Sequence, residues 1–215
     1  MKSYVVIGLG KFGERVAQQL CALGNEVLAI DTDADLVQQV SGYVTNAAVA
    51  DAQDKDILMA LGVKECDCAV VAIGGSLAAS VMTTMNLQEL GIPKIVCKAK
   101  DDAHRRVLEK LGADRVVIPE KEVADRLAHS LASTNVLEFI ELSTDYGIVE
   151  VPAPQKWVGK NLRELNIRAK MGVNIIAIRT SHGVKISPSA EHVIDSYDVL
   201  VILGDYDALT VVQNL

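Results

Sequence analysis

Aromatic residues are scarce in this chain: Phe, Tyr and Trp make up 4% of its 215 residues, although half of all residues are apolar. Val, Ile, Leu and Ala must therefore fill the core, as they do in parallel sheets that helices cover on both faces. No apolar run approaches the roughly 20 residues that a membrane-spanning helix needs. Met1 and Lys2 lead directly into an apolar stretch that is too short for a signal peptide. We therefore expect a soluble, cytoplasmic protein that reaches a membrane only by docking.

Positive charge is also in the minority, with 21 Lys and Arg against 28 Asp and Glu and a net charge of −7. Because the chain has no strong basic tract either, we expect no nucleic-acid partner. None of the cysteines forms a CxxC pair, and no His spacing indicates zinc. We interpret them as small buried hydrophobic residues in a reducing compartment. They are Cys21, Cys66, Cys68 and Cys97.

The clearest motif lies in residues 1–31. Residues 4–7 (YVVI) are a short apolar run, residues 8–13 (GLGKFG) are rich in glycine, and residues 27–31 (VLAID) are a second apolar run that ends in an acid. A segment with helical periodicity joins the glycines to the second run. The pattern predicts a strand, a phosphate-binding turn, a helix, a second strand and a terminal carboxylate.

Each part of this motif has a mechanical task. Gly8 permits a tight turn out of the strand, Gly10 lets a pyrophosphate approach the backbone, and Gly13 lets the helix lie close to the strand. The free N–H groups at the helix start attract phosphates, and the helix dipole adds to the attraction. Asp31 can accept both ribose hydroxyls, and its charge argues against a 2′-phosphorylated nucleotide. The alternative is an ordinary strand–helix turn beside a solvated Asp.

Strand-like apolar runs and helical segments continue to alternate through six units, up to about residue 132. This alternation predicts an α/β fold with a Rossmann-like, doubly wound parallel sheet, whose ligands bind beyond the carboxyl ends of the strands. Polar residues occupy several predicted strand ends, where this topology would bring them to one crevice. They are Asp31, Asp51, Ser76, Lys98 and Glu120.

The character of the chain changes after Ser133. We therefore predict a nucleotide-binding domain over residues 1–133 and a second domain over residues 134–215. The second domain has strand-like runs near residues 148–151, 174–179 and 199–203, a loop with a short helix near 157–168 and a helix near 206–212, which predicts a small α+β fold. A domain of this size is marginally stable alone and would gain stability by dimerising.

Several stretches together resemble one known family, although the glycine turn alone is not specific. They are residues 6–13 (VIGLGKFG), 26–31 (EVLAID), 70–74 (VVAIG), 107–115 (VLEKLGADR), 119–121 (PEK), 166–170 (NIRAK) and 198–202 (DVLVI). Over nearly its whole length the chain resembles the KtrA/TrkA-type RCK (regulator of potassium conductance) family. Members are cytosolic regulatory subunits of Ktr and Trk potassium uptake systems.

The resemblance implies a regulator and not an enzyme, with a first domain that binds ATP or ADP instead of using NAD or NADH for redox chemistry. It implies a homo-oligomeric ring, an octamer built from dimers, at the inner face of the cell membrane. The ring would dock on a membrane-embedded potassium-translocating subunit of the KtrB/TrkH type, with ATP favouring the open state and ADP the closed state. The RCK C domain of such proteins can bind cyclic di-AMP at its dimer interface, which lowers transport.

We assign the nucleotide site to the glycine turn and the polar strand ends. Asp51 can accept a hydrogen bond from the adenine amino group, and Lys98 can meet a phosphate. The resemblance places Glu120 where the family helps to bind a cation, divalent or monovalent, across the dimer; the alternative is a carboxylate that the helix dipole favours. The candidate residues are Gly8, Gly10, Lys11, Phe12, Gly13, Asp31, Thr32, Asp33, Asp51, Ala52, Ala72, Ile73, Gly74, Lys98 and Glu120.

Lys11 departs from the family pattern, which usually has an Arg there that faces the γ-phosphate of a neighbouring copy. Lys cannot grip a phosphate with two parallel hydrogen bonds, so ATP/ADP discrimination through this residue stays open. For cyclic di-AMP our candidates are Asn166, Ile167, Arg168 and Ile175, because an Arg fork suits a phosphodiester and apolar side chains can flank a base. The alternative is a surface Arg beside a core Ile.

Two other functions fit the same motif. The turn and Asp31 suit NAD as well as ATP, which would fit a small NAD-dependent oxidoreductase. Against this reading, the second domain is small and no acid/base pair or metal cluster is evident. The chain could also be a scaffold whose crevice is vestigial. Titration with ATP, ADP and NADH would distinguish these alternatives.

Overall fold

The computed structural model describes residues 1–132, 137–143, 145–213 and 215. The chain forms two compact units, Met1–Glu120 and Lys121–Leu215. The predicted domain boundary at 133/134 lies outside the described residues. The division between the two units falls inside helix α6 (Pro119–Ala132), which begins in the first unit and continues into the second.

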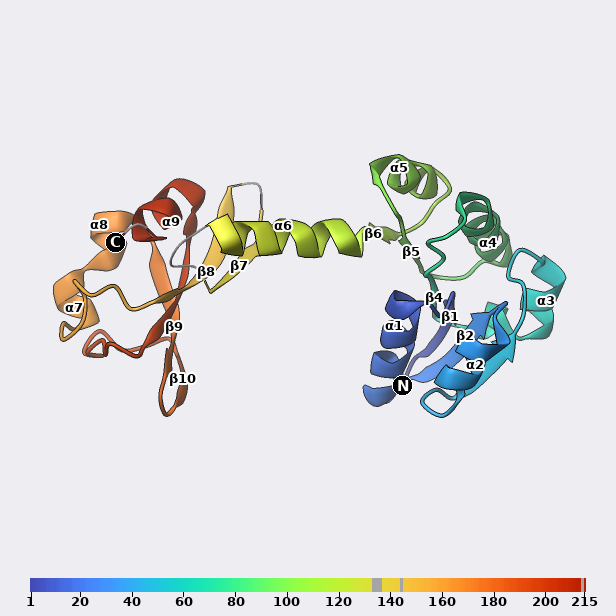
Figure 1. Ribbon diagram of the computed structural model, residues 1–215, viewed down its shortest axis with the longest axis horizontal. Coiled ribbons are helices and arrows are strands. Elements are labelled where there is room, and N and C mark those ends of the chain that lie inside the picture. Colours follow the sequence, from blue (N-terminus) through green and yellow to red (C-terminus); the bar gives the residue numbers. More distant parts are fainter. Residues whose placement is uncertain (133–136, 144, 214) are drawn as a thin grey trace. The chain divides into compact units, whose positions relative to one another are not determined.

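The first unit is built on a six-stranded parallel sheet with the strand order β3-β2-β1-β4-β5-β6 (Figure 1). The chain extends the sheet from β1 to one side, then returns and extends it to the other. The predicted doubly wound sheet is therefore confirmed, and its order reverses between β1 and β4, where such sheets bind ligands. The strands are β1 (Ser3–Ile7), β2 (Glu26–Asp31), β3 (Asn46–Val49), β4 (Cys68–Val71), β5 (Ile95–Lys98) and β6 (Arg115–Val117).

Helices cover both faces of this sheet, because successive strand residues point to opposite sides. On one face, Val6 and Ala29 pack in a cluster with Ala17 and Val40 of helices α1 (Lys11–Ala22) and α2 (Ala34–Ser41). On the other face, Val5 and Ile30 belong to a larger cluster that holds residues of three further helices. These are α3 (Lys55–Ala60), α4 (Leu77–Leu90) and α5 (Asp102–Lys110). A 3-10 turn, η1 (Val63–Glu65), precedes β4.

Acidic caps set where several of these helices begin. The side chains of Asp33, Asp54 and Asp101 accept backbone N–H groups at the starts of α2, α3 and α5. Such caps satisfy N–H groups that have no partner inside the helix. The start of α1 differs, because its N-cap is Gly10 and no side chain caps it.

The second unit is a small α+β domain with a five-stranded antiparallel sheet in the order β10-β9-β11-β8-β7. Its core combines sheet residues such as Ile178 and Leu200 with Trp157 and Leu209. The edge strands β7 and β10 were not predicted; each is only four residues long, and in β10 every residue is exposed. The elements are β7 (Glu138–Glu141), β8 (Tyr146–Pro152), α7 (Leu162–Leu165), α8 (Ile167–Met171), β9 (Asn174–Thr180), β10 (Gly183–Ile186), β11 (Val199–Asp205) and α9 (Tyr206–Gln213).

Candidate nucleotide-binding site

The glycine-rich turn between β1 and α1 has a backbone that only glycine accommodates well. Gly8 has a φ of +92°, in the left-handed region. Gly13 packs on it so closely that a Cβ at Gly13 would lie 1.8 Å from the Gly8 carbonyl oxygen. A Cβ at Gly10, by contrast, would meet no atom within 4 Å. The tight turn at Gly8 and the close packing at Gly13 are confirmed, and the approach of a phosphate to Gly10 stays a prediction.

The first turn of α1 faces this open space with its N–H groups uncapped by any side chain. Within the turn, the Glu14 N–H donates to the Gly10 carbonyl oxygen at 2.9 Å, which begins the helical pattern. The N–H groups that precede it have no intrahelical acceptor and carry the positive end of the helix dipole. A helix start with these properties is a ready anion site.

Asp31 ends β2 beside the glycine turn, and the backbone orients its carboxylate. Its Oδ2 accepts the N–H of Leu9 at 2.5 Å, and its Oδ1 accepts the N–H of Asp33 at 2.9 Å. Each carboxylate oxygen accepts more than one hydrogen bond. The Thr32 hydroxyl also donates to Oδ1 at 3.5 Å, so the acceptor capacity that Asp31 retains toward a ribose lies chiefly at Oδ2.

The turn that follows β3 forms another wall and carries Asp51. The Asp51 carboxylate accepts the backbone N–H of Gln53 at 2.9 Å and the Gln53 side-chain amide at 3.2 and 3.3 Å. From α4, the buried Asn86 donates to the backbone oxygens of Ala52 and Gln53. These contacts place an oriented acceptor at the strand end where the sequence predicted one.

A cavity of about 400 Å³ joins these walls beyond the carboxyl ends of β1 to β4. It brings together many of the predicted residues, namely Gly8, Gly10, Asp31, Thr32, Asp51, Ala52, Ala72, Ile73 and Gly74. Lys11, Phe12, Gly13, Asp33, Lys98 and Glu120 are not part of its lining.

The cavity also contains Ser76, one of the polar strand ends expected at this crevice, and residues that were not predicted: Ile7, Ala50, Gln53, Gly75 and Ala79. The sequence could have indicated Gln53, because Asp51 stands two residues before it. An Asp side chain often accepts the backbone N–H two residues further on, which forms an Asx turn. Ser76 was recognised at a strand end but was not assigned to the site. A polar residue such as Asn86 inside an apolar helix pattern is another signal, since buried amides need partners.

Lys98 and Glu120 form an ion pair near the rim of the cavity. Lys98 Nζ lies 2.6 Å from Glu120 Oε1 and 5.7 Å from the centre of the Phe12 ring. The hydrogen bond from Lys98 holds the pKa of Glu120 below its ordinary value. A Cβ at Gly74 would lie 3.8 Å from Lys98 Nζ. Lys98 thus lies close to Gly74, which lines the cavity, but is not itself part of the lining, and its phosphate contact stays a prediction.

The described residues of one chain do not form a metal centre at Glu120. They contain no group of three or more His, Cys, Asp or Glu side chains that could hold a metal ion. The Glu120 carboxylate already pairs with an ammonium group. A cation there would need ligands from outside this chain, so the metal assignment at Glu120 stays a prediction.

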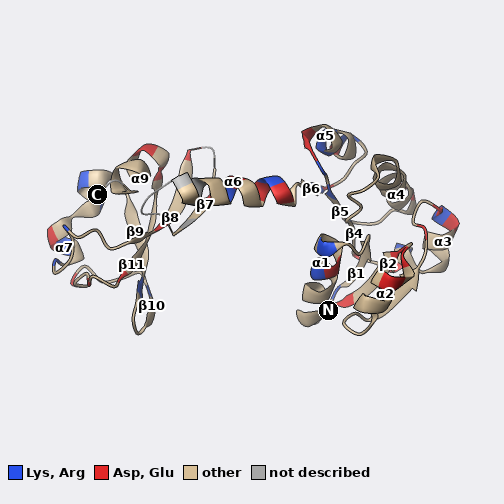
Figure 2. Ribbon diagram, viewed as in Figure 1, with Lys and Arg blue, Asp and Glu red and all other residues tan. Residues whose placement is uncertain are grey.

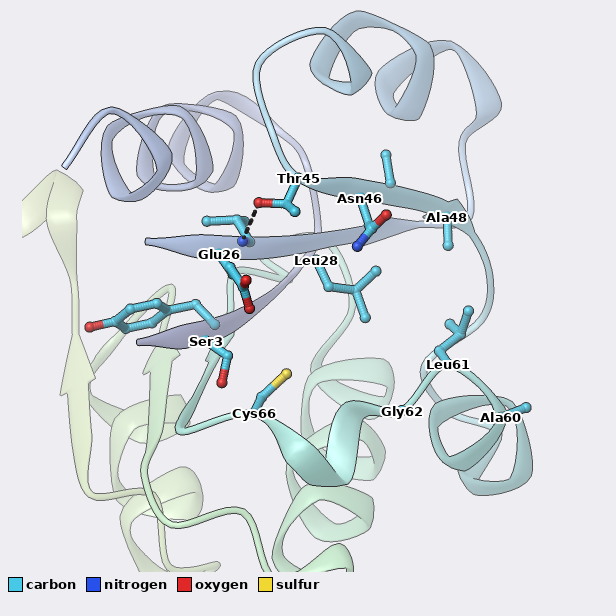
Figure 3. A pocket seen from close by; sticks show the side chains of 13 residues that line it. Ser3, Glu26, Leu28, Thr45, Asn46, Ala48, Ala60, Leu61, Gly62 and Cys66 are labelled. Carbon is cyan, nitrogen blue, oxygen red and sulfur yellow. Dashed lines mark hydrogen bonds between the residues drawn. The ribbon is translucent and has the colours of Figure 1, made fainter. Parts of the chain in front are cut away.

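A second cavity in the first unit, of about 560 Å³, lies at the opposite ends of the strands (Figure 3). Ser3, Glu26 and Asn46 begin β1, β2 and β3, and they line this cavity together with Leu28 and Leu61. Its lining has no counterpart of the 8–13 turn, and the Glu26 carboxylate would repel a phosphate. The geometry therefore favours the carboxyl-end crevice as the nucleotide site.

The residues predicted for a second ligand gather in the second unit. Asn166, Ile167, Arg168 and Ile175 all line one shallow cavity of about 150 Å³. Asn166 joins α7 to α8 with a φ of +45°, a left-handed conformation that Asn tolerates better than most residues. The cavity holds only part of a dinucleotide, so a ligand of that size would need a further surface.

Two further observations concern the charged residues and the apolar character of the helices. Figure 2 shows basic and acidic residues interspersed along the helices of both units. Among the residues that the structure describes, no helix combines the length and the apolar character required to cross a bilayer.

Comparison with known protein families identifies two domains in the chain. The TrkA-N domain family matches residues 4–119, and the TrkA-C domain family matches residues 147–215. These matches correspond closely to the parallel-sheet unit and to the second unit from β8 onward.

Curated relatives match almost the whole chain. Ktr system potassium uptake protein C of Bacillus subtilis is 42% identical over 94% of this chain and 92% of its own length. Ktr system potassium uptake protein A of the same organism is 42% identical over 94% of this chain and 91% of its own. Among solved structures, the GsuK RCK domain matches with a TM-score of 0.71 and 20% identity, and it covers all of this chain and 47% of that longer one.

The glycine turn, the two-unit architecture and these matches agree with one another. This chain therefore belongs to the KtrA/TrkA-type RCK family, the regulatory subunits of Ktr potassium uptake systems.

Proposed function

We propose that this regulatory subunit senses ATP and ADP in its first unit and thereby gates a membrane-embedded potassium-translocating partner, with ATP activating and ADP inactivating. The observation that supports this most directly is the uncapped start of α1 beside the oriented Asp31 carboxylate in one cavity. That arrangement suits a nucleotide, with phosphates at the helix start and ribose at the acid.

Each wall of the cavity then has one role. The N–H groups at the start of α1 hold phosphates, Asp31 accepts the ribose hydroxyls, and Asp51 accepts the adenine amino group. The cavity of about 400 Å³ is of the size of small-molecule sites. None of these residues needs to transfer a proton or a hydride, so binding alone serves the proposed function.

ATP and ADP can act differently only if the protein binds them differently in its two states. The Lys98 ammonium is the candidate for this difference, since it lies near Gly74 at the cavity rim and pairs with Glu120. With a third phosphate in reach, Lys98 would share its charge between that phosphate and Glu120. The start of α6, where Glu120 lies, would then shift. This shift would change the angle between paired first units.

We further propose that the second unit dimerises, that dimers assemble into an octameric ring at the inner face of the membrane, and that cyclic di-AMP binds at residues 166–175. The gathering of the candidate residues at one cavity supports the ligand site. Since that cavity is small, a second copy would supply the rest of the binding surface. Light scattering measures the ring size, and copurification with a KtrB/TrkH-type subunit tests the docking.

Calorimetric titration with ATP, ADP, NADH and cyclic di-AMP tests the proposal, and a pair of glycine variants makes it specific to the site. Gly10→Ala adds one methyl group where a Cβ meets nothing within 4 Å, so the fold should persist while the approach of a phosphate is obstructed. Gly42→Ala is the matched control, because Gly42 has equal space at the end of α2, outside the cavity.

We expect adenylate affinity to fall at least about ten-fold in Gly10→Ala and to remain unchanged in Gly42→Ala. A preference for NADH together with turnover of an alcohol or aldehyde would favour the oxidoreductase. No binding of any nucleotide at millimolar concentration would favour a scaffold with a vestigial crevice.

A further inference from the structure

Asn86 is a buried amide that the nucleotide site does not contact. Its side chain lies on α4 and only 8% of the residue is exposed. An amide that is removed from water without hydrogen bonds destabilises a protein, so its partners explain why it is there. Asn86 is absent from the cavity lining, so any role toward a ligand must be indirect.

The partners of Asn86 are both backbone oxygens of the turn that carries Asp51. Asn86 Nδ2 donates to the Ala52 oxygen at 3.2 Å and to the Gln53 oxygen at 2.8 Å. One amide group therefore holds two successive peptide units of the turn. This contact joins α4, whose first residues border the cavity, to the segment after β3.

The same turn is held from its other side by β2. The Ala50 N–H donates to the backbone oxygen of Asp31 at 2.9 Å, and the Asp51 carboxylate accepts the Gln53 N–H at 2.9 Å. Asp51 thus lies between an anchor on the strand that carries the ribose-binding acid and an anchor on α4. Removing the α4 anchor frees residues 52–53 and, through Gln53, the direction of the Asp51 carboxylate.

We propose that Asn86 is a positioning residue for base recognition: it orients Asp51 so that the site distinguishes 6-amino purines from 6-oxo purines. The inference rests on the proposed nucleotide site and adds the origin of its specificity. A carboxylate accepts hydrogen bonds and donates none, so one directed at position 6 favours an amino group there and repels an oxo group. A 6-oxo purine offers its neighbouring donor, the N1–H, in a different direction. The preference depends on the direction of the carboxylate, which Gln53 holds directly and Asn86 holds through the backbone of Gln53.

Calorimetry with ATP and inosine triphosphate tests this, because the two differ at position 6 of the base. The variants are Asn86→Ala and, as a matched control on the same helix, Thr83→Val. Thr83 is fully buried and its hydroxyl has no hydrogen-bond partner among the described residues, so its loss removes no contact. If Asn86→Ala does not fold, Asn86→Ser is measured instead, since its single hydroxyl cannot hold both carbonyl oxygens.

We expect wild type and Thr83→Val to bind ATP at least about ten-fold more tightly than inosine triphosphate, the usual effect of a hydrogen bond to a charged group. In the Asn86 variant, ATP binding should weaken about five-fold or more while binding of inosine triphosphate changes less than about two-fold. Equal weakening of both ligands, or an unchanged ratio, would overturn the role of Asn86 and leave the nucleotide site intact. Absence of adenylate binding in wild type would overturn both proposals.

Discussion

At the scale of single residues, specific hydrogen-bond partners stabilise the buried His104 of the first unit. His104 is 2% exposed; its Nδ1 accepts the Lys100 N–H at 3.4 Å and its Nε2 lies 3.2 Å from the Ser80 hydroxyl. An imidazole that accepts at one nitrogen is neutral. Burial lowers the pKa of His104, against the opposing effect of Asp101 and with a smaller contribution from Lys100.

This lowered pKa predicts a pH dependence of stability. As pH falls below the unfolded value near 6.5, the unfolded chain binds a proton before the folded chain does, so the free energy of unfolding decreases. The contribution of neutral His104 to the free energy of unfolding is fully present above that pH. It is lost as the pH falls through the lower pKa of His104 in the folded state. In His104→Asn, the melting temperature should depend less steeply on pH across this range. His182→Asn, at an exposed position, is the control; equal slopes in all three proteins would contradict the prediction.

Cysteine chemistry belongs to the same scale. Cys66, Cys68 and Cys97 are buried, and Cys21 is partly exposed. Burial raises the pKa of Cys97 to about 11, although the Thr84 hydroxyl opposes the shift. The interpretation of the cysteines as small buried residues is therefore confirmed for Cys66, Cys68 and Cys97. A thiol with a raised pKa supplies little thiolate near neutral pH and is a poor nucleophile.

At the scale of elements, the start of α1 contrasts with the capped starts of α2, α3 and α5. Gly10 has the extended backbone of an N-cap, with φ −62° and ψ 179°, but offers no side chain to the helix. Ser, Thr, Asp or Asn at such a position stabilises a helix. The start of α1 therefore lacks the side-chain cap that stabilises the starts of α2, α3 and α5, and the proposed phosphate contact gives a reason.

We therefore predict opposite effects on stability and binding when a cap is introduced there. Gly10→Asp should stabilise the nucleotide-free protein by about 0.5 kcal/mol, because a carboxylate at the N-cap accepts free N–H groups and interacts favourably with the dipole. The same carboxylate should abolish ATP binding by repelling phosphate. Urea unfolding and calorimetry measure the two effects, and ATP binding at wild-type strength would contradict the assignment of the phosphates to this helix.

At the scale of the whole molecule, the chain holds two separate cores. The parallel-sheet unit encloses apolar clusters on both faces of its sheet, and the antiparallel unit has a cluster of its own around Trp157. Ligands of the two proposed sites would therefore stabilise different units, since a ligand stabilises the structure that it binds.

Hydrogen exchange can test this separation directly. ATP at about one hundred times its Kd should slow exchange in residues 1–120, with a limit near 2.7 kcal/mol of added protection, and should leave β8, β9 and β11 nearly unchanged. Cyclic di-AMP should instead protect residues around 166–175. If ATP protected the second unit as strongly as the first, the two units would have to unfold together.

Much of the fold followed from residue patterns that act locally. The alternation of apolar runs and helical segments predicted the parallel sheet, because a strand covered on both faces reads as a continuous apolar run. Acids before α2, α3 and α5 mark helix starts by the same local logic. The edge strands β7 and β10 escaped prediction because an edge strand has an exposed face and shows no continuous apolar signal.

The sequence by itself determined the glycine turn, Asp31 and the order of strands and helices, since these depend on steric limits and on the period of apolar side chains. Only the tertiary structure decided that Asn86 holds the turn that carries Asp51 and that Lys98 pairs with Glu120. Those contacts join residues that are far apart in the chain. A local sequence pattern cannot predict them, because the topology of the sheet decides which distant residues meet.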